Sequence, residues 1–311
     1  MGNKSSDAGA SSGSRAGPGA GPGAGPGASS GADAGAGGGA YAYEQDVAVA
    51  AAEEAGAMLC ERFRQAHTVG SKGGNGDVVT DLDLTAEKLI LARLQTHFPH
   101  ERILSEEAGL FDAVGRRTWL VDPLDGSNNV AIGLTAYAVG IGLCVEGAPV
   151  VGVVHEPVTG RTWRAALGQG AYCGSAGLTG PSGSVPPSGP VVAWTQGHAV
   201  NRADATARSL RGALELRSRR VLQLWAPLLG WSMLAHGAID GFVGYCAEAV
   251  DFPAGALLAS EAGVEFRTLA GGPFQVSFTG PDSERSFVAA RAEMLPFLLD
   301  LVAAATPTDR T

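Results

Sequence analysis

Carboxylate side chains gather at three places where a predicted strand ends or a predicted helix begins. Glu106 and Glu107 follow one short β-type run. Asp122 and Asp125 follow a second, and Asp251 precedes an apolar helix. Strand ends are where layered α/β proteins place their sites. Several carboxylates without a neighbouring His or Cys favour hard cations with oxygen ligands, so the pattern predicts a divalent-cation site.

The segment from Asp122 to Asn129 has a spacing that suits such a site. Asp122 and Asp125 are three residues apart, and the proline between them stiffens the turn. Both carboxylates can then converge on a metal pair, with a backbone carbonyl between them. Gly126 allows close approach of the backbone to a ligand, and Ser127 with the next amides would open a helix that favours phosphate oxygens. Two metals about 3.5–4 Å apart could hold the attacking water and the leaving oxygen.

Each acidic cluster also has a purely structural interpretation. Paired glutamates such as Glu106 and Glu107 are usually a solvated surface, and Asp-Pro and Asp-Gly both favour turns. Asp251, which precedes a Phe-Pro pair, could be a helix N-cap followed by proline in the first turn. A calcium EF-hand loop is excluded, because position 12 counted from Asp122 is Gly133.

Composition narrows the classes of function. The chain has 311 residues with 45% hydrophobic content, which is enough for one large domain or two smaller ones. Its net charge of -9 argues against binding nucleic acid or an anionic membrane through the general field. The longest mostly apolar run, residues 130–145, is shorter than the roughly 20 residues that span a bilayer. No CxxC motif and no apolar leader are present, so we expect reduced thiols in a cytoplasmic protein.

The chain divides into a tail and an ordered part. Residues 1–40 are rich in Gly, Ala, Pro and Ser, and we expect them to be disordered. Their start fits the pattern for acylation of Gly2, although chance explains that match better in a tail of this composition. The segment 174–190 is rich in Gly, Pro and Ser, and it suggests an N-terminal α+β metal-binding subdomain at 41–185 and a C-terminal α/β subdomain at 186–305.

Periodicity predicts a mixture of helices and strands, which indicates a layered α/β or α+β fold. Helices are expected at about 41–65, 84–98, 201–211, 225–237, 252–262 and 292–303. Strands are expected at about 78–80, 103–104, 119–121, 136–145, 150–155, 162–166, 191–195, 241–246 and 286–290.

The motifs, taken in order, resemble those of the inositol monophosphatase superfamily, which includes fructose-bisphosphatases, 3'(2'),5'-bisphosphate nucleotidases and histidinol-phosphate phosphatases. The resemblance spans roughly residues 44–300. The family's Asp-Pro-Leu/Ile-Asp-Gly-Ser/Thr-x-Asn is complete at 122–129, and its Glu-Glu pair stands at 106–107. Its Lys-x4-Asp-x-Val-Thr-x2-Asp is matched at 72–83, and its last aspartate motif at 250–263.

The resemblance implies a set of metal ligands. Glu106, Asp122 and the Leu124 carbonyl would bind a first magnesium ion. Asp122, Asp125 and Asp251 would bind a second, and Glu106 would also join a third, weaker site. The implied cofactor is therefore Mg²⁺, with two or three ions in each active site.

The resemblance also implies a mechanism and a fold. Ser127, oriented by Asp83, would help Glu106 to activate a water that attacks directly, without a phosphoenzyme. The amides of Gly126 and Ser127 would bind phosphate. The fold would be the layered αβαβα sandwich of α+β class, and the protein would be a homodimer.

The departures from the family pattern concern the substrate pocket more than the metal ligands. Val250 stands where the family has tryptophan, and Pro253 replaces an alanine. The family's Arg-x-x-Gly-Ser/Cys turn falls at 222–226, where Gly and Ser are missing. Many inositol phosphatases have a sugar-binding Glu near Gly244, and neighbouring Glu248 could take that role.

The sequence therefore predicts a magnesium-dependent phosphatase acting on a cyclitol or sugar monophosphate, with His198 as a candidate substrate contact. The alternatives are histidinol phosphate, fructose 1,6-bisphosphate or a bisphosphorylated nucleotide. A nucleotide would require basic or stacking residues at the pocket mouth, for which Trp225, Arg219 and Arg220 are candidates. A catalytically inactive binding protein is the alternative of another class, and a missing metal ligand would favour it. We expect no nucleic-acid or membrane partner.

Overall fold

The computed structural model describes residues 39–65, 68–72, 77–181 and 183–305. The predicted tail, with Gly2, lies outside the described residues except for Gly39 and Ala40. Residues 73–76, which belong to the motif at 72–83, lie outside the described residues as well. Residues 38–311 form one compact unit, which contains all the described helices and strands.

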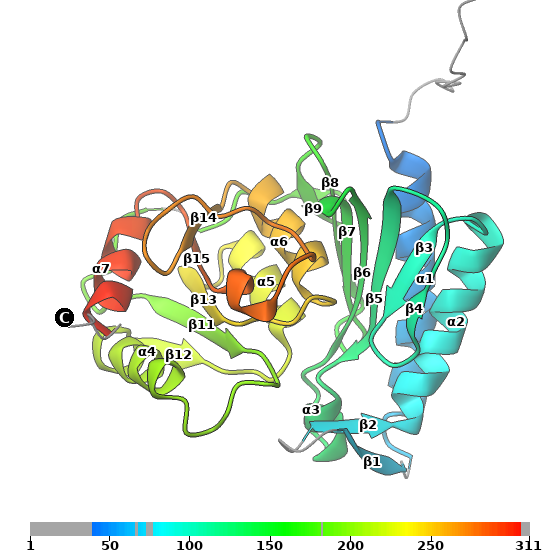
Figure 1. The fold of residues 1–311 in the computed structure, drawn as a ribbon, viewed down its shortest axis with the longest axis horizontal. Coiled ribbons are helices and arrows are strands. Elements are labelled where there is room, and N and C mark those ends of the chain that lie inside the picture. Colours follow the sequence, from blue (N-terminus) through cyan, green and yellow to red (C-terminus); the bar gives the residue numbers. More distant parts are fainter. Residues whose placement is uncertain (1–38, 66–67, 73–76, 182, 306–311) are drawn as a thin grey trace, which may run out of the picture. The chain divides into compact units, whose positions relative to one another are not determined.

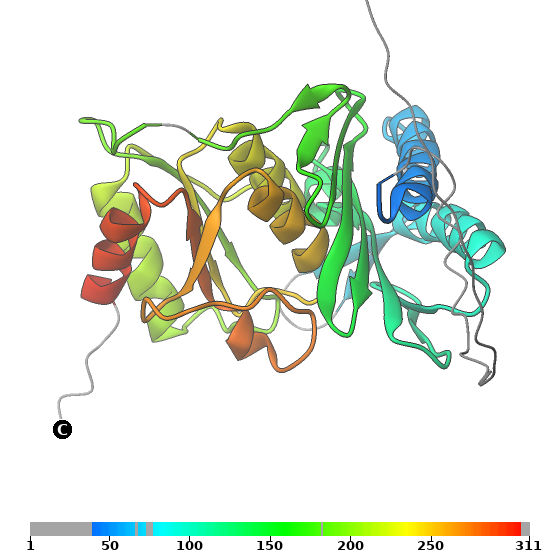
Figure 2. The same ribbon diagram turned by 90° about the horizontal axis from the view of Figure 1, so that it is seen from above.

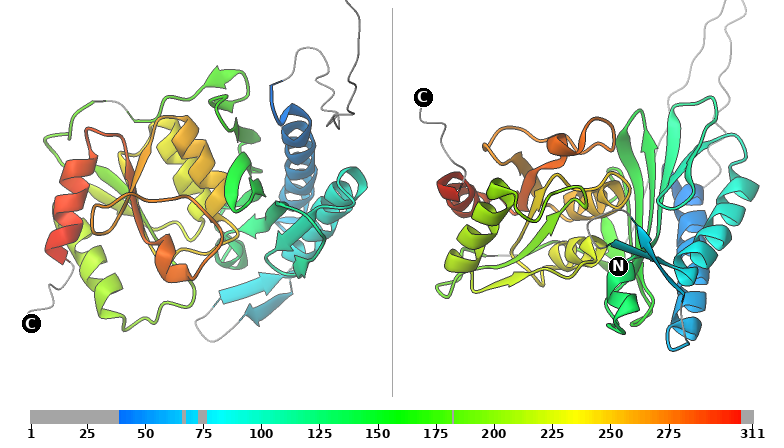
Figure 3. Two further views of the ribbon diagram at one scale, coloured as in Figure 1. Left: turned by 45° about the horizontal axis from the view of Figure 1, so that its top comes forward. Right: turned by 60° about the horizontal axis from the view of Figure 1, so that its bottom comes forward.

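The described part of the chain has five layers, in the order helices, sheet, helices, sheet, helices (Figure 1, Figure 2). Two helices cover the outer face of each sheet, and two more lie between the sheets. Figure 3 shows the same layered arrangement from two further directions. The three pairs are α1 (Ala42–Arg62) with α2 (Asp81–His97), α5 (Pro227–His236) with α6 (Phe252–Glu261), and α4 (Ala205–Arg217) with α7 (Leu295–Ala305). This arrangement confirms the predicted αβαβα sandwich of α+β class.

The first sheet has eight strands, in the order β10-β9-β8-β7-β6-β5-β3-β4. All neighbouring strands in it are antiparallel except β3 and β5, which are parallel. Its strands are β3 (Arg102–Ser105), β4 (Gly109–Phe111), β5 (Arg117–Asp125), β6 (Ala138–Val145), β7 (Ala148–Glu156), β8 (Arg161–Ala166), β9 (Ala171–Cys173) and β10 (Ala176–Gly177). A separate hairpin, β1 (Val69–Lys72) and β2 (Asp77–Thr80), precedes α2, and the short α3 (Ser127–Ala131) follows β5.

The second sheet has five strands, in the order β12-β11-β13-β15-β14. Its strands β12, β11 and β13 are parallel, whereas β15 and β14 run antiparallel to their neighbours. They span β11 (Val191–Gln196), β12 (Arg220–Leu222), β13 (Gly241–Tyr245), β14 (Glu265–Thr268) and β15 (Phe287–Ala290), with the 3-10 turn η1 (Asp282–Arg285) before β15. Because parallel strands end at the same edge, their following loops lie close together.

Helix α6 shows how the middle layer is built. Residues 252–259 of this helix are all buried, since one sheet packs on each side of it. A helix in such a position must be apolar around its whole circumference, which explains the uniform Phe-Pro-Ala-Gly-Ala-Leu-Leu-Ala sequence. Small residues bring it close to the first sheet: a Cβ added to Gly152 of β7 would lie 2.5 Å from the carbonyl oxygen of Ala254.

Several predicted boundaries differ from the structure. The helix expected at 201–211 is wrong in its position, because α4 begins at Ala205 after Asp204, whose side chain accepts a hydrogen bond from the Ala207 amide at 2.8 Å. Six short strands of two to four residues were not predicted, namely β1, β4, β9, β12, β14 and β10, the last of which lies within the expected loop 174–190. The chain passes from the first sheet to the second between β10 and β11, and the division into two subdomains stays a prediction.

Two findings bear on the class of protein. All four cysteines are free. Among the helices in the described ranges, none combines the length and the apolar character needed to cross a bilayer.

The close approach at Gly152 makes a testable prediction. Gly152→Ala should lower the free energy of unfolding by about 1–3 kcal/mol, because its methyl group would overlap the α6 backbone. Gly212→Ala is the matched control, since a Cβ at this position of α4 meets no atom within 4 Å. It should raise the stability by about 0.5–1 kcal/mol. Urea unfolding measures both, and equal stability of the two variants would contradict the packing described.

Candidate active site

The ends of the parallel strands in both sheets meet at one cavity of about 890 Å³. In the first sheet, Glu106 follows β3, and the aspartates lie at the end of β5. In the second sheet, the residues that follow β11, β12 and β13 line the same cavity. Sites at the carboxyl ends of parallel strands are a general consequence of this topology.

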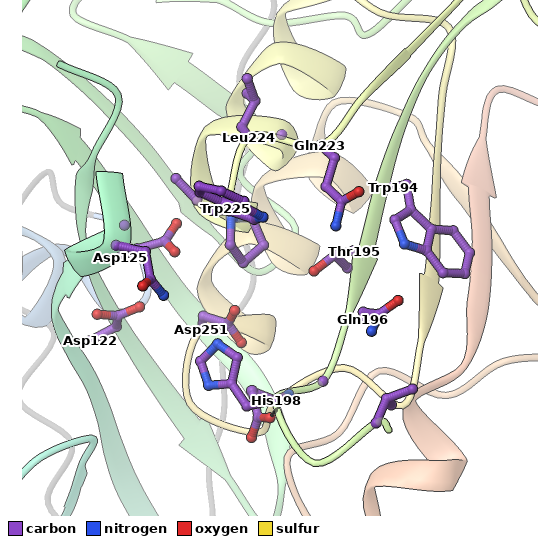
Figure 4. A pocket seen from close by; sticks show the side chains of 18 of the residues that line it. Asp122, Asp125, Trp194, Thr195, Gln196, His198, Gln223, Leu224, Trp225 and Asp251 are labelled. Carbon is purple, nitrogen blue, oxygen red and sulfur yellow. Dashed lines mark hydrogen bonds between the residues drawn. The ribbon is translucent and has the colours of Figure 1, made fainter. Parts of the chain in front are cut away.

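The structure brings the predicted site residues together. All of them except Asp83 line the cavity, and Asp83 contacts one that does. Figure 4 shows Asp122 and Asp125 on one wall, with Asp251 and His198 beside them. The predicted residues that line the cavity are Glu106, Asp122, Leu124, Asp125, Gly126, Ser127, His198 and Asp251.

Backbone amides orient the two aspartates of β5. The strand has an irregular register against β6 between Asp122 and Asp125, which lets both side chains face the cavity. The Leu124 amide donates to Oδ1 of Asp122 at 3.1 Å. The Leu228 amide, in the first turn of α5, donates to Oδ2 of Asp125 at 2.6 Å. Asp125 thus connects the first sheet to the middle layer of helices.

Gly126 and Asn129 shape the turn after β5. Gly126 has φ 108°, and a Cβ there would lie 2.9 Å from the Ala136 carbonyl oxygen, so only glycine fits. The amide nitrogen Nδ2 of Asn129 donates to the carbonyls of Ala136 and Leu224, both at 2.6 Å. Asn129 therefore fastens the turn to the loop after β12, a role that the sequence analysis did not assign.

Asp83 connects the start of α2 to Ser127. Its Oδ2 accepts hydrogen bonds from the amide and hydroxyl of Thr80, at 2.8 and 2.5 Å, in a capping box. Its Oδ1 accepts from the Ser127 hydroxyl, which also lies 3.0 Å from the Leu124 carbonyl oxygen. Burial raises the pKa of Asp83, the hydrogen bonds from Ser127 and Thr80 lower it, and repulsion from Glu106 adds to the rise.

The buried carboxylates of the cavity repel one another. Burial is the main cause that raises the pKa of Asp122 well above its ordinary value, and the charges of Glu106, Asp125 and Asp251 raise it further. Burial, followed by the charge of Asp251, also raises the pKa of Asp125 well above its ordinary value, although the hydrogen bond from the Leu228 amide lowers it. Burial, then Glu248 and Glu106, raise the pKa of Asp251 to about 8. Cations would relieve this repulsion.

The surroundings of Asp251 distinguish its two interpretations, as a helix N-cap or as a cation ligand. It stands before α6, but its side chain makes no capping hydrogen bond, and its Oδ1 is buried without a partner. The N-cap interpretation is therefore wrong for this carboxylate. An orphaned, buried carboxylate oxygen that lines a cavity with other carboxylates is suited to a cation.

The donor set fits a hard divalent cation, because it consists of carboxylate and carbonyl oxygens. Within the described residues, no three His, Cys, Asp or Glu side chains already lie close enough together to hold a metal ion. A cation would therefore have to draw the mutually repelling carboxylates inward. The Leu124 carbonyl oxygen lies 3.0 Å from the Ser127 hydroxyl, whose single proton goes to Asp83, so the lone pairs of the carbonyl are available to a cation.

Glu87 is a positioning residue that sequence reasoning missed. This carboxylate of α2 is buried, and its Oε1 accepts hydrogen bonds from the Ser105 hydroxyl and from the amides of Glu107 and Ala108, at 3.2 and 2.9 Å for the two amides. It therefore fixes the turn that carries Glu106. The available signal was its place four residues after Asp83, which puts both carboxylates on one helix face.

A model of the inositol monophosphatase family matches residues 41–305 of this sequence. The chain belongs to the inositol monophosphatase family. Inositol monophosphatase 1 of Solanum lycopersicum is 32% identical over 262 residues, which cover 78% of this chain and 93% of the relative. The Nus factor SuhB of Escherichia coli strain K12 is 30% identical over 220 residues, which cover 70% of this chain and 82% of the relative.

The similarity to solved structures agrees with the similarity of the sequences. The solved structure of an IMPase from Thermotoga maritima matches with a TM-score of 0.73 and 25% identity, covering 85% of this chain and 98% of that one. Membership in the inositol monophosphatase family supports a phosphatase activity on small phosphate esters.

This member of the inositol monophosphatase family has an unusual residue in the loop after β12. Trp225 lies in the segment where the family's Gly and Ser are missing, and it has φ 53°, a left-handed conformation that favours glycine. Holding a bulky residue there costs roughly 1–3 kcal/mol. Its side chain is 57% exposed and lines the cavity (Figure 4).

Other pocket residues were only partly anticipated. Glu248 lines the cavity as suggested, and its Oε1 accepts a hydrogen bond from the His198 amide at 2.7 Å. The suggestion that Arg219 and Arg220 serve the pocket mouth is wrong, because neither lines the cavity. The arginines that do so are Arg202, Arg208 and Arg211.

The raised pKa of Asp251, which burial causes first and neighbouring carboxylates second, predicts how stability depends on pH in EDTA. The pKa of Asp251 is about 8 in the folded protein but about 3.9 in an unfolded chain. Its contribution is therefore fully present below about pH 4 and is lost as pH rises through 8. Asp251→Asn should remove up to about 1.4 kcal/mol per pH unit from this fall. Urea unfolding between pH 5 and 9 checks this, and parallel curves for the two proteins would contradict it.

Proposed function

We propose that this protein is a magnesium-dependent phosphatase that hydrolyses a small-molecule phosphate monoester, with an inositol or sugar monophosphate as the substrate. The observation that carries the proposal is the set of buried, mutually repelling carboxylates beside the Ser127–Asp83 pair, in one cavity of about 890 Å³. The complete ligand set argues against a catalytically inactive relative. We further propose that the protein is a cytoplasmic homodimer. We also propose that it has no nucleic-acid or membrane partner, because a net charge of -9 repels both kinds of anionic surface.

The proposed roles begin with charge. Asp122, Asp125, Asp251 and Glu106, with the Leu124 carbonyl, would hold two or three Mg²⁺ ions. A bound divalent cation supplies the positive charge that offsets the phosphate and makes water a stronger nucleophile at neutral pH. The carboxylates alone would repel an anionic substrate, so this chain requires the cations for binding as well as for rate.

The proton chemistry falls to the chain's own side chains. Ser127 Oγ lies between the Leu124 carbonyl and Asp83, and this fixed hydroxyl can accept a proton from water while passing its own to Asp83. Glu106 helps to orient the same water. Direct attack of water on phosphorus then needs no phosphoenzyme. The amides of Gly126 and Ser127, at the cavity wall, would bind the phosphate oxygens.

Phosphate release from a panel of compounds tests the proposal. The panel contains inositol 1-phosphate, glucose 1-phosphate, fructose 1,6-bisphosphate, histidinol phosphate and adenosine 3',5'-bisphosphate. Release should depend on magnesium, stop in EDTA and fall by at least about a hundredfold in Asp125→Asn. Asp112→Asn makes the same chemical change at a side chain that is 74% exposed, and it should leave the rate unchanged. Release that survives in EDTA or in Asp125→Asn would reject the metal-dependent mechanism.

The Ser127 hydroxyl has a separate test. Ser127→Ala should lower kcat by about 100-fold or more while KM changes little, because the hydroxyl handles a proton and does not hold the substrate body. Ser127→Thr keeps the hydroxyl, and it should retain most of the activity. Steady-state kinetics on the best substrate of the panel measures both. Equal losses in the two variants would mean that the position matters for packing alone.

A further inference from the structure

The cavity extends well beyond the carboxylates. Figure 4 shows Asp122 and Asp125 at one side of the view and Trp194 at the other, with Gln223 and Thr195 in between. The volume of about 890 Å³ lies toward the upper end of small-ligand pockets, which hold roughly 300–1,000 Å³. There is room for a substrate with a second functional group.

Two arginines stand at the far end of this cavity. Arg208 and Arg211 are three residues apart on α4, so they share one helix face, and both line the cavity. The buried residues Ala207 and Leu210 of the same helix pack in one cluster with Trp194. The arginines therefore belong to the Trp194 end of the cavity and not to the carboxylate end.

These guanidinium groups are available to a ligand. Within the part of the chain that the structure describes, neither Arg208 nor Arg211 has a side-chain hydrogen bond or an ion pair. Arg208 is exposed and Arg211 is half-buried, so both guanidinium groups can be reached from the solvent-filled cavity that they line. A planar guanidinium with several N–H donors matches the oxygens of phosphate or carboxylate.

Trp194 provides an independent sign that this end binds something polar. Its side chain is 2% exposed and lines the cavity, and its indole Nε1 has no hydrogen-bond partner. A buried N–H without a partner costs free energy, and tryptophan usually finds an acceptor for it. An anion beside the arginines would supply that acceptor.

We propose that Arg208, Arg211 and the indole N–H of Trp194 form a second anion-binding subsite, so that the preferred substrate carries a second anionic group besides the scissile phosphate. That the bound molecule is a substrate rests on the proposed function, whereas the binding of an anion at the subsite does not depend on hydrolysis. The aromatic face of Trp225, exposed in the same cavity, then packs against the body of the molecule between its two charges.

Calorimetric titration of the wild-type chain with inorganic phosphate in EDTA tests the subsite without any hydrolysis. Under these conditions the carboxylate end repels phosphate, so the binding that remains reports the arginines. Arg208→Gln/Arg211→Gln should weaken it by at least about tenfold. Arg219→Gln/Arg220→Gln removes the same charge from two exposed arginines outside the cavity, and it should bind as the wild type does. No saturable binding, or equal binding in both double variants, would overturn the proposal.

A matched series of substrates tests what the subsite selects. Glucose 1-phosphate, glucuronic acid 1-phosphate and glucose 1,6-bisphosphate differ only at carbon 6, which carries a hydroxyl, a carboxylate or a phosphate. The wild type should prefer one of the two doubly anionic compounds by about tenfold or more in kcat/KM, and Arg208→Gln/Arg211→Gln should abolish that preference. A wild-type preference for glucose 1-phosphate, which has only a hydroxyl at carbon 6, would overturn the role in selectivity.

The two experiments separate the two proposals. If magnesium produces no phosphate release from any compound while phosphate binding in EDTA still depends on Arg208 and Arg211, the proposed function fails and the subsite stands. If release depends on magnesium but the arginine variants change neither binding nor preference, the proposed function stands and the subsite fails.

Discussion

The burial of several carboxylates side by side is the interaction on which the rest of this structure depends. Asp122, Asp125 and Asp251 each have a raised pKa, because burial and their mutual repulsion both oppose ionisation. Such a cluster stays in place only if its neighbours hold it there. The Leu228 amide holds Asp125, and Glu87 holds the turn that carries Glu106. The same repulsion would favour the binding of cations, so the cost in stability and the proposed chemistry have one origin.

The topology explains why these groups meet at all. Parallel strands in each sheet end at the cavity, and the middle layer of helices begins beside it. Asn129 links the turn after β5 with the loop after β12, and Asp125 links β5 with α5. A movement of either sheet would therefore disturb the carboxylates. The tight contact between Gly152 and α6 serves the same end, because it keeps the middle layer against the first sheet.

The two ends of the cavity differ in how closely they follow the inositol monophosphatase family. The carboxylate end keeps the carboxylates of the family motifs, whereas the loop after β12 has Trp225 where the family turn has small residues. Because the carboxylates belong to the shared motifs, we expect substrate choice to depend on the residues that diverge from the family pattern. Trp225 has a left-handed backbone, and Arg208 and Arg211 have no side-chain partner among the described residues; a pocket shaped only for a small neutral polyol requires neither feature.

The sequence by itself determined the parts of the site that are local. The segment from Asp122 to Asn129 is contiguous, so its spacing indicated the pair of aspartates, the Gly126 turn and the start of α3. The five-layer fold followed from the family motifs rather than from periodicity, which missed the shortest strands. Only the tertiary structure decided whether Asp251 caps a helix or faces the cavity, and which arginines line it. These outcomes depend on contacts between residues far apart in the chain, such as α4 against β11, and no local spacing encodes them.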